Sequence, residues 1–327
     1  MATINHSSTS PQLYDVIIVG AGVAGISAAI SLAKLNRSVI IFEARGRTGG
    51  RVFTDKSINV DMGAQWIHGR LNNPLYPISC ANKFVTKPTD YDHSKLFDKT
   101  GPVDITRNEH VRDVWGKVSH LLDVKIADCK SSGAVFSLQN VMDLVMDELK
   151  LDELDRNICA FSAASAFEHE YAAHCSLLSA TNFDEGNTYF GEDCVIVDGY
   201  NQIINVLLQD LSSCPIVCPI VFDTIVKSVT YNNATDVRVQ TADGTTYCSK
   251  KIIITVPLGI LKRSFKDTES NALLFQNLST NTRNSKDIAS IHFEPPLPDL
   301  HITAIRSLGY GITQLCTPIT PLVLIYH

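Results

Sequence analysis

Three glycines and one acid near the N-terminus have the types and the spacing to bind a dinucleotide. Gly20, Gly22 and Gly25 follow an apolar run at residues 15–19, which is the G-x-G-x-x-G spacing of a phosphate-binding turn. The first glycine permits a tight turn, the second lets the backbone approach a pyrophosphate, and the third lets the next helix pack close to the strand. Glu43 follows a second apolar run and can accept hydrogen bonds from an unphosphorylated ribose.

A strand, a helix and a second strand must position these residues. We expect the strand at residues 15–19, the helix at about residues 23–35 and the second strand at residues 38–42, with the free N–H groups of the helix facing the phosphates. Ala21 and Ala24 lie in the same turn and belong to the predicted cofactor site. A glycine turn alone would equally be an ordinary turn of an α/β protein. The complete pattern favours a dinucleotide but does not separate NAD from FAD.

The segment directly after Glu43 separates the two cofactors. It holds three arginines and two adjacent glycines, and arginine neutralises a pyrophosphate while donating hydrogen bonds in a fixed fork. We prefer Arg51 for the phosphate contact because it follows the two glycines, whereas Arg45 and Arg47 could equally be solvated. The predicted cofactor site in this segment comprises Glu43, Ala44, Arg45, Gly50 and Arg51.

These motifs resemble those of the flavin-containing amine oxidases and, within that family, the polyamine oxidases. The family's E-A-R-x-R-x-G-G-R element matches residues 43–51 at every fixed position, and its G-A-x-W-I-H-G turn matches residues 63–69. The resemblance covers nearly all of residues 12–262 and implies FAD as the cofactor. Further matches are Asn73-Pro74, E-Y-A at 170–172, D-G-Y at 198–200, Val226, and V-P-L-G-I-L-K at 256–262.

The resemblance also implies where the substrate binds. On residues alone, a histidine beside Trp66 in an apolar turn is more often structural than catalytic. The resemblance reverses that preference for His68 and implies that it orients or deprotonates an amine near the flavin. Trp66 is equally a core aromatic or a ring that packs on the flavin, and Glu170 and Tyr171 are equally cavity residues or part of a surface helix. The remaining predicted cofactor contacts are Gly63, Ala64, Gln65, Trp66 and Val226.

The reaction implied by the resemblance is oxidation of a polyamine or related amine at the carbon next to nitrogen. The product imine would hydrolyse to an aldehyde and a shorter amine, FAD would take the hydride equivalent, and oxygen would reoxidise it with release of hydrogen peroxide. The expected partners are therefore the small-molecule amine and oxygen. An NAD-dependent dehydrogenase fits the glycine turn but not segments 43–51 and 63–69.

Composition fits a large enzyme and sets limits on its partners. The chain has 327 residues, of which 45% are hydrophobic and 19% charged, and its net charge of −6 disfavours nucleic acid as a partner.

Residues 1–12 lack the apolar core of a secretory signal, and no apolar run reaches the length of a membrane span. We therefore expect no membrane association and a cytoplasmic protein, with a peroxisomal location also open. The nine cysteines are scattered, Cys214 and Cys218 lack the partners of a zinc site, and no metal is expected.

Along the chain, the patterns predict an α/β fold of two domains, similar to the FAD-dependent amine oxidases. A Rossmann-type FAD-binding domain would comprise residues 12–72 and 190–262, and an α+β substrate domain residues 73–189 and 263–327. The first should include a strand at 194–197, a helix at 200–211 and a β-meander from 224 to 255. The second should include a helix from about residue 152 and, before it, one capped by Ser137 that carries Val141, Leu144, Val145 and Leu149 on one face.

Two features depart from the family pattern. Residues 263–292 are rich in Ser, Thr and Asn, where relatives have a shorter link, and this predicts a flexible insert. The lysine that relatives place near the flavin is absent, because the aligned position is about Leu315. Residues 317–327 form an apolar tail in place of a second flavin-contacting segment, so the substrate domain is expected to be incomplete and the chain truncated. Two hypotheses stay open: an FAD-dependent polyamine or amine oxidase, or a catalytically silent fragment of one with little or no activity.

Overall fold

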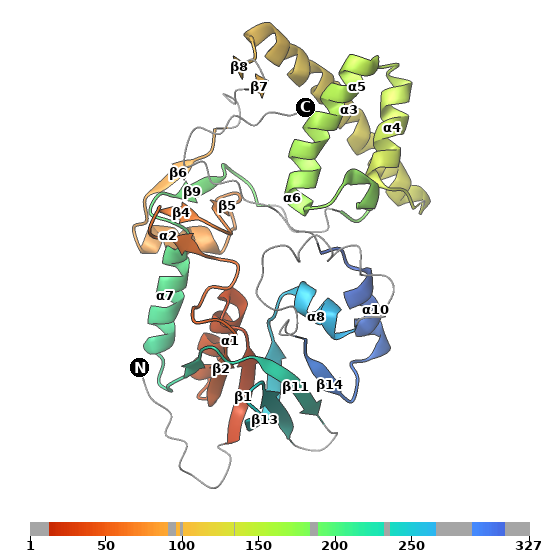
Figure 1. Ribbon diagram of the computed structural model, residues 1–327. Helices are drawn as coiled ribbons and strands as arrows, with labels where there is room; N and C mark the ends of the chain where they lie inside the picture. Colours follow the sequence, from red (N-terminus) through yellow and green to blue (C-terminus); the bar gives the residue numbers. More distant parts are fainter. Residues whose placement is uncertain are drawn as a thin grey trace. The chain divides into compact units, whose positions relative to one another are not determined.

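The computed structural model describes residues 13–90, 96–98, 101–133, 135–183, 189–231, 236–265 and 290–310. These residues fall into two compact units (Figure 1). We call residues 13–87 with 193–308 the sheet unit, and residues 88–192 with 309–310 the helical unit. The roles predicted for two domains, and their predicted boundaries, stay a prediction.

The sheet unit is built on a seven-stranded sheet in the order β10-β2-β1-β13-β12-β11-β14. Its parallel part begins with the predicted strand–helix–strand unit, in which β1 and β2 pair in parallel and α1 connects them. β1 also pairs in parallel with β13, and β2 with β10. The bounds are β1 Leu13–Val19, α1 Val23–Lys34, β2 Val39–Phe42, β10 Ile220–Val221 and β13 Thr246–Ile254.

The central strands are continuous apolar runs because both faces of the sheet are covered. Val16 and Ile18 of β1 pack in the core that contains α1 and α7 (Asn201–Ser212), and these two helices lie side by side (Figure 1). Ile17 and Val19 point to the other face, into a second core formed with the later strands. The glycine turn at the end of β1 is therefore anchored from both sides.

The predicted β-meander is confirmed by β11, β12 and β13, which pair antiparallel in succession. β12 reads Val-Arg-Val-Gln-Thr, and its valines are buried while Arg238 and Gln240 are exposed, as expected for a strand with one solvated face. β14 then pairs in parallel with β11. The bounds are β11 Val226–Tyr231, β12 Val237–Thr241 and β14 His292–Glu294.

Short elements cover the N-terminal end of α7. A hairpin of β3 (Thr54–Asp55) and β4 (Val60–Asp61) supplies the cap, because the Asp61 carboxylate accepts the N–H of Tyr200 at 3.0 and 3.1 Å and Thr54 Oγ1 accepts the N–H of Asn201 at 3.0 Å. The negative carboxylate at this position also interacts favourably with the positive N-terminal end of the helix dipole. The predicted helix at 200–211 is thus confirmed, and it is capped by residues distant in sequence.

The predicted strand at 194–197 is confirmed as β9 (Cys194–Ile196), but it does not enter the main sheet. It lies in a three-stranded sheet in the order β5-β9-β6, where it pairs antiparallel with β5 (Trp66–Ile67). The third strand is β6 (Thr86–Pro88), and α2 (Leu75–Ala81) lies between β5 and β6 along the chain. This small sheet carries the turn that contains His68.

The helical unit is a bundle of three main helices around a core of its own. The predicted cap at Ser137 and the predicted helix start near residue 152 are confirmed, since Ser137 and Asn140 form a capping box and the Asp152 carboxylate accepts the N–H of Asp155. The prediction that Leu144 shares a face with Val141 and Val145 is wrong: the exposed fraction of Leu144 is 54%, because the face of the helix centred on Val141 and Val145 points to the core. The helices are α3 Ile105–Ser132, α4 Leu138–Glu148 and α5 Glu153–Ala163.

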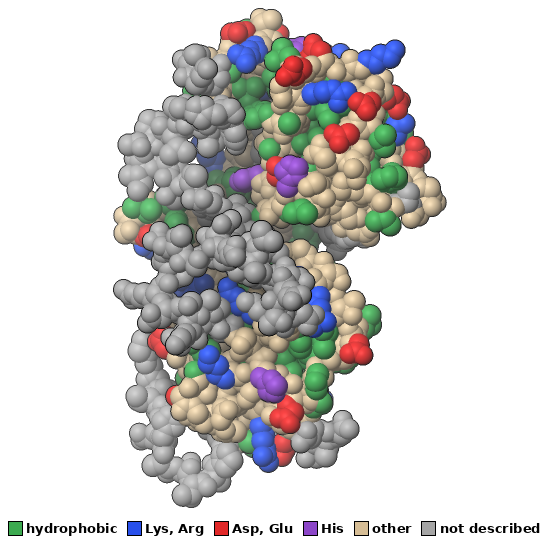
Figure 2. All heavy atoms as spheres, turned by 45° about the vertical axis from the view of Figure 1, so that its right-hand side comes forward, with side chains coloured by type: hydrophobic (Ala, Val, Ile, Leu, Met, Phe, Trp, Pro, Cys, Tyr) green, Lys and Arg blue, Asp and Glu red, His purple; other side chains and the backbone are tan. Residues whose placement is uncertain are grey.

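The rest of the helical unit is made of short elements. A π-helical turn at Ala164–Glu168 follows α5 and leads into α6 (His169–Tyr171) and a 3-10 turn at Cys175–Leu177. A hairpin of β7 (Phe97–Asp98) and β8 (Gly101–Pro102) precedes α3. On the face that Figure 2 shows, acidic and basic side chains are interspersed over this unit.

Several sequence predictions concern segments outside the described residues. The predicted insert at 263–292 is described only at its two ends, where helix α8 (Leu258–Ser264) includes its first residues and β14 begins at its last; residues 266–289 are not described, and α10 (Asp299–Ser307) follows. Leu315 and residues 317–327 also lie outside the described part of the chain. The cysteines that are described are free thiols. No helix in the described ranges combines the length and apolar character needed to cross a membrane.

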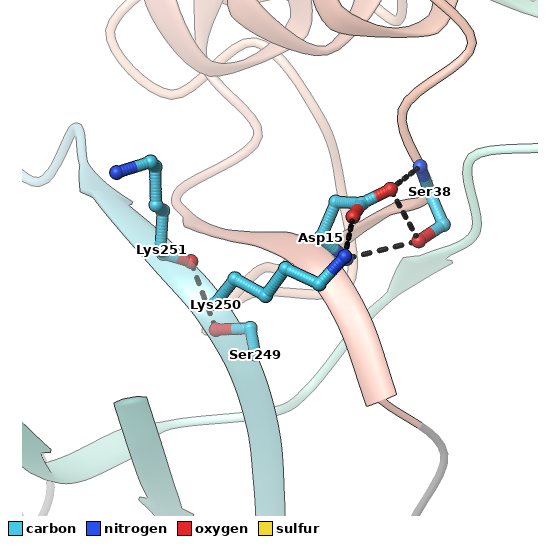
Figure 3. A network of polar contacts seen from close by, with 5 residues as sticks. All are labelled: Asp15, Ser38, Ser249, Lys250 and Lys251. Atoms are coloured by element: carbon cyan, nitrogen blue, oxygen red, sulfur yellow. Dashed lines mark hydrogen bonds and ion pairs between the residues drawn. The ribbon is translucent and has the colours of Figure 1, made fainter. Parts of the chain in front are cut away.

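A polar network ties the start of β1 to its two neighbours (Figure 3). The Asp15 carboxylate accepts Lys250 Nζ of β13 at 2.7 Å, and Ser38, just before β2, donates its N–H to the same carboxylate at 2.9 Å. In return, the N–H of Asp15 donates to Ser38 Oγ at 2.9 Å. The hydrogen bond from Lys250, followed by that from Ser38, lowers the pKa of Asp15 to about 2.

We predict that this network makes a pH-dependent contribution to stability. The folded-state pKa of Asp15 is below its ordinary value of 3.8, so the contribution is fully present above about pH 4 and is lost as pH falls through about 2. Asp15→Asn should lower the urea midpoint at neutral pH, and its deficit relative to wild type should shrink toward pH 2.

The control for this prediction is Asp113→Asn. Asp113 pairs with Lys117 at the same 2.7 Å, but both side chains are more than 60% exposed, and such pairs contribute little. A deficit in Asp15→Asn that stays constant between pH 7 and pH 2.5 would contradict the assignment.

Candidate functional site

The glycine turn has the shape that the sequence predicted. Gly20 has a φ of +109°, and a Cβ at Gly25 would lie only 1.9 Å from the carbonyl oxygen of Gly20, so α1 packs against the turn as closely as backbone atoms permit. Thr255 lies under this turn and donates its hydroxyl to the carbonyls of Val19 and Gly20 at 2.9 and 3.1 Å. The N-terminus of α1 is thereby fixed at the end of β1.

Neither the backbone conformation nor the contacts of Gly22 with the described residues require a glycine at this position. Its φ is −80°, which any residue adopts, and among the described residues a Cβ there would approach nothing closer than Gly49 O at 3.8 Å. Gly22 is the N-cap of α1 and supplies no side-chain cap, so the first N–H groups of the helix are left for another acceptor. Ala24 in this first turn is exposed, whereas Ala21 is buried. The missing side chain keeps a helix N-terminus open, which suits a pyrophosphate.

Glu43 is a buried carboxylate at the end of β2, with an exposed fraction of 7%. Its Oε2 accepts the N–H of Ala21 at 2.8 Å and its Oε1 accepts the N–H of Arg45 at 2.9 Å. Its own backbone N–H donates to Val221, and its carbonyl accepts from Thr224. Each carboxylate oxygen has a second lone pair, so Glu43 can still accept hydroxyl groups while it holds the two loops together.

The two glycine motifs meet in the structure. Gly22 and Gly49 form an isolated parallel bridge, and the N–H of Gly49 donates to the carbonyl of Ala21 at 2.8 Å. A Cβ at Gly50 would lie 3.6 Å from the Cα of Gly22. The sequence predicted both motifs as parts of one cofactor site, and the structure places them in contact.

The arginines of this segment differ in their surroundings. Arg45 and Arg51 are exposed, as a contact with an added ligand would require. Arg47 is not simply solvated: its guanidinium donates to the carbonyls of Thr48 and Gly50, both at 3.1 Å, and lies 4.3 Å from the centre of the Phe53 ring. Arg47 therefore holds the glycine loop in shape, while the phosphate role of Arg51 stays a prediction.

The loop after the hairpin brings the second predicted motif beside the first. A Cβ at Gly63 would lie 1.9 Å from the carbonyl oxygen of Arg51, and Ala64 donates its N–H to that carbonyl at 3.2 Å. Gln65 Nε2 donates to the Asp61 carbonyl at 2.8 Å. Trp66 is half-buried in β5, and its ring lies 6.4 Å from that of His68 at a shallow angle. The core role and the flavin contact weighed for Trp66 both stay predictions.

His68 is an exposed histidine in a turn fixed from two sides. Its side chain is 68% exposed, and its Nδ1 lies 3.0 Å from Oδ2 of Asp193, which is 22% exposed. The other oxygen of Asp193 accepts the N–H of Gly69 at 2.8 Å. Buried Asn73 donates its amide to the carbonyl of His68 at 2.8 Å and accepts the N–H of Leu75. Hydrogen bonds to Asp193 and Asn73 therefore fix the turn that carries the exposed side chain of His68.

The other predicted site residues divide between the two units. Val226 is buried in β11, two residues after Thr224, whose N–H donates to the carbonyl of Glu43; its strand therefore lies beside the acid. Glu170 is exposed in the helical unit, and Tyr171 packs its ring edge-on against Phe183 at 5.5 Å. Their predicted place in a substrate cavity stays a prediction.

Sequence reasoning assigned no site role to three residues that shape this site. They are Asp193, the partner of His68; Asn73, which fixes the same turn; and Thr255, which lies under the glycine turn. Asn73 was noted only as part of the Asn73-Pro74 match and Thr255 only as the end of a predicted strand, and neither pattern indicated these contacts. Asp193 gave less signal, because it is 125 residues from His68 and only the pairing of β5 with β9 brings the two together.

The fold is that of an α/β protein with a mixed sheet, and the arrangement of Gly22, Glu43 and Gly49 fits the predicted dinucleotide site. Comparison with known proteins narrows the class. Residues 23–314 match the family model described as "Flavin containing amine oxidoreductase". The chain belongs to this family. A flavin is the family's cofactor, so the prediction of FAD rather than NAD is confirmed.

Individual relatives are longer than this chain. It is 31% identical to "Polyamine oxidase 4" of Oryza sativa subsp. japonica, over 95% of this chain and 60% of that protein. It is 30% identical to "Polyamine oxidase 2" of Arabidopsis thaliana, over 91% of this chain and 57% of that protein. It is also 28% identical to "Lysine-specific histone demethylase 2" of Homo sapiens, over 92% of this chain and 34% of that protein. The chain thus spans about 60% of the length of the polyamine oxidases it matches.

The residues present fit the adenosine diphosphate part of FAD. The room left at Gly22 lies at a helix N-terminus that has no side-chain cap, and the carboxylate of Glu43 has acceptor capacity left for a ribose. Bound there, the pyrophosphate would face the N–H groups at the start of α1, and Arg45 and Arg51 are exposed nearby in sequence to neutralise it.

We predict that Glu43→Gln weakens FAD binding by about 1–3 kcal/mol, the scale of a poorly matched buried polar group. The amide nitrogen of Gln would face the N–H of Ala21 or of Arg45, so a donor would meet a donor. Titration of the apoprotein with FAD, followed by quenching of flavin fluorescence, measures the effect. Glu148→Gln, an exposed partner of Lys125, is the control and should leave the affinity unchanged. Equal affinity of Glu43→Gln and wild type would contradict the role of Glu43.

Proposed function

We propose that this protein takes part in FAD-dependent oxidation of a polyamine or related amine, giving an aldehyde, a shorter amine and hydrogen peroxide. The observation that carries the proposal is the seat at Gly22, which keeps a helix N-terminus open beside a buried acid and a second glycine loop. Membership of the flavin-containing amine oxidoreductases supports amine oxidation, and the polyamine oxidases among the relatives favour a polyamine.

In this proposal the two units have different functions. The sheet unit would hold the cofactor, and the helical unit would belong to an α+β substrate domain. This assignment moves residues 73–87, 263–265 and 290–308 to the cofactor side, because they are part of the same compact unit as the glycine turn, and moves residues 190–192 to the helical unit. The support is the continuity of α2 and β6 with the small sheet that carries His68.

The chain's own residues would bind, orient and deprotonate. Bound FAD would supply the acceptor for the hydride equivalent from the carbon next to nitrogen, and oxygen would be the final oxidant, reduced to hydrogen peroxide. The start of α1 and Glu43 would fix the dinucleotide end, so that the reactive end is held in one place. His68, exposed beside Trp66, would bind the substrate amine and take its proton, because only a neutral amine nitrogen has a lone pair to assist loss of hydride.

A second candidate is FAD binding without turnover. The observation that favours it is the leucine at about position 315, where the resembled enzymes carry a lysine near the flavin. On this hypothesis the chain holds FAD but forms no peroxide with any amine. The demethylases among the relatives add another amine to test besides the polyamines, a methylated lysine in a peptide.

We predict slow but amine-dependent peroxide formation by the FAD-loaded chain with spermine or an acetylated polyamine. His68→Gln should lower turnover by about 10²–10⁴-fold, the usual contribution of a general base, with FAD content unchanged. A peroxide-coupled assay measures the rate, and flavin absorbance measures the content. His110→Gln, which removes a histidine from a different ion pair in the helical unit, is the control.

Three results would change the proposal. A yellow protein that forms no peroxide with polyamines or methyl-lysine peptides would support the second candidate. Turnover with the peptide alone would move the substrate from polyamines to protein lysines. Loss of flavin in His68→Gln to the same extent as loss of turnover would assign His68 to a structural role.

A further inference from the structure

The contact between His68 and Asp193 determines which ring nitrogen of His68 carries a hydrogen. Nδ1 of His68 lies 3.0 Å from Oδ2 of Asp193, and the other oxygen of Asp193 accepts the N–H of Gly69. Both oxygens therefore face the turn that follows β5, and an ionised carboxylate offers acceptors only. The nitrogen that faces it must carry a hydrogen.

This contact determines which nitrogen of a neutral His68 is free. A neutral imidazole has one N–H and one lone pair, and the hydrogen bond made by one nitrogen decides the state of the other. If Nδ1 carries the hydrogen, Nε2 carries the lone pair. Among the residues the structure describes, Nε2 of His68 has no hydrogen-bond partner, and the side chain is 68% exposed. The lone pair is thus directed away from Asp193 and is accessible.

We propose that Asp193 is a positioning residue that holds His68 in the Nδ1–H tautomer, so that Nε2 is the atom that accepts the substrate's proton. This inference rests on the proposed function for its catalytic meaning. The proton would pass from the ammonium nitrogen of the substrate to Nε2, which leaves the amine neutral with its lone pair free. The resulting imidazolium keeps its Nδ1–H bond to Asp193, and the carboxylate stabilises its positive charge.

The surrounding structure makes Asp193 rigid enough for this role. Asp193 directly precedes β9, and the pairing of β9 with β5 brings it to the residue that follows Ile67. Asn73, buried and bonded to the carbonyl of His68, holds the turn from the other side. A purely structural role for Asp193 would require only the hydrogen bond to Gly69, whereas the proposed role also requires the hydrogen bond to Nδ1.

Asp193→Asn separates these two roles. An Asn side chain can keep its oxygen on the N–H of Gly69, and its amide group then donates toward Nδ1 of His68. Nδ1 must become the acceptor, so the hydrogen moves to Nε2 and the lone pair there is lost. The substitution preserves the shape of the turn and inverts the tautomer.

The chain also offers a matched control with the opposite geometry. His110 of α3 contacts Asp155 of α5 through Nε2 at 2.8 Å, and Asp155 has the same 22% exposure as Asp193. The same argument gives His110 the Nε2–H tautomer. Asp155→Asn should therefore affect His110 and leave His68 unchanged.

The experiment is long-range ¹H–¹⁵N NMR of the full chain labelled at histidine, recorded at about pH 8, where imidazoles are neutral. His68→Gln and His110→Gln assign the signals. The expected wild-type result is a protonated Nδ1 and an unprotonated Nε2 for His68, with a preference of about tenfold or more. His110 should show the reverse. Asp193→Asn should invert the pattern of His68 alone, with circular dichroism unchanged.

The possible outcomes each decide the question. A wild-type His68 with Nε2–H or with mixed tautomers would overturn the proposal, even if Asp193→Asn failed to fold. An unchanged tautomer in a folded Asp193→Asn would overturn it as well. The tautomer is measured without turnover, so a chain that forms no peroxide but shows the expected pattern would remove the proposed function and leave the assignment of Asp193 intact.

Discussion

The carboxylate of Glu43 is the contact on which the proposed cofactor seat depends. It lies at the end of β2, and each of its oxygens accepts a backbone N–H from a different loop, Ala21 of the glycine turn and Arg45 of the arginine-glycine segment. A buried carboxylate whose two oxygens each accept one backbone N–H is stable only while both loops stay in place. The bridge between Gly22 and Gly49 follows from this arrangement.

A second set of contacts fixes the opposite end of the site. The turn after β5 is held by Asn73 and Asp193, and Gly63 allows the preceding loop to lie against the carbonyl of Arg51. The segments that carry Glu43, Arg51 and His68 are therefore connected through backbone contacts within one compact unit. This connection explains why motifs that are separate in the sequence act as one candidate site.

Local patterns in the sequence predicted most elements of the sheet unit, because burial on one or both faces leaves a periodic signal. β1, α1 and the meander of β11, β12 and β13 were all predicted from such signals. The failure at Leu144 has a simple cause: an apolar residue one position outside the buried face of α4 fits the same helical period. The position of β9 could not be predicted, because a strand of three residues does not reveal its partner.

The site was predicted less completely than the fold. Residues with a fixed motif, such as Gly22 and Glu43, were found because their chemistry demands particular types at a particular spacing. Asp193 belongs to no such motif, and its role depends on a pairing across 125 residues. The contacts of Arg47 with Gly50 and Phe53 could likewise not be predicted from the sequence, because an arginine near a pyrophosphate motif can face either the ligand or its own loop.

The central claim is that the seat at Gly22 and Glu43 recognises the adenosine diphosphate part of FAD. Isothermal titration of the apoprotein with FAD, FMN, NAD and ADP tests it most directly. FMN carries the same flavin and one of the two phosphates but lacks the adenosine monophosphate of FAD, so the account predicts that FAD binds much more tightly than FMN, that ADP competes with FAD, and that NAD binds more weakly than FAD. FMN binding as tightly as FAD, or NAD binding more tightly, would contradict it.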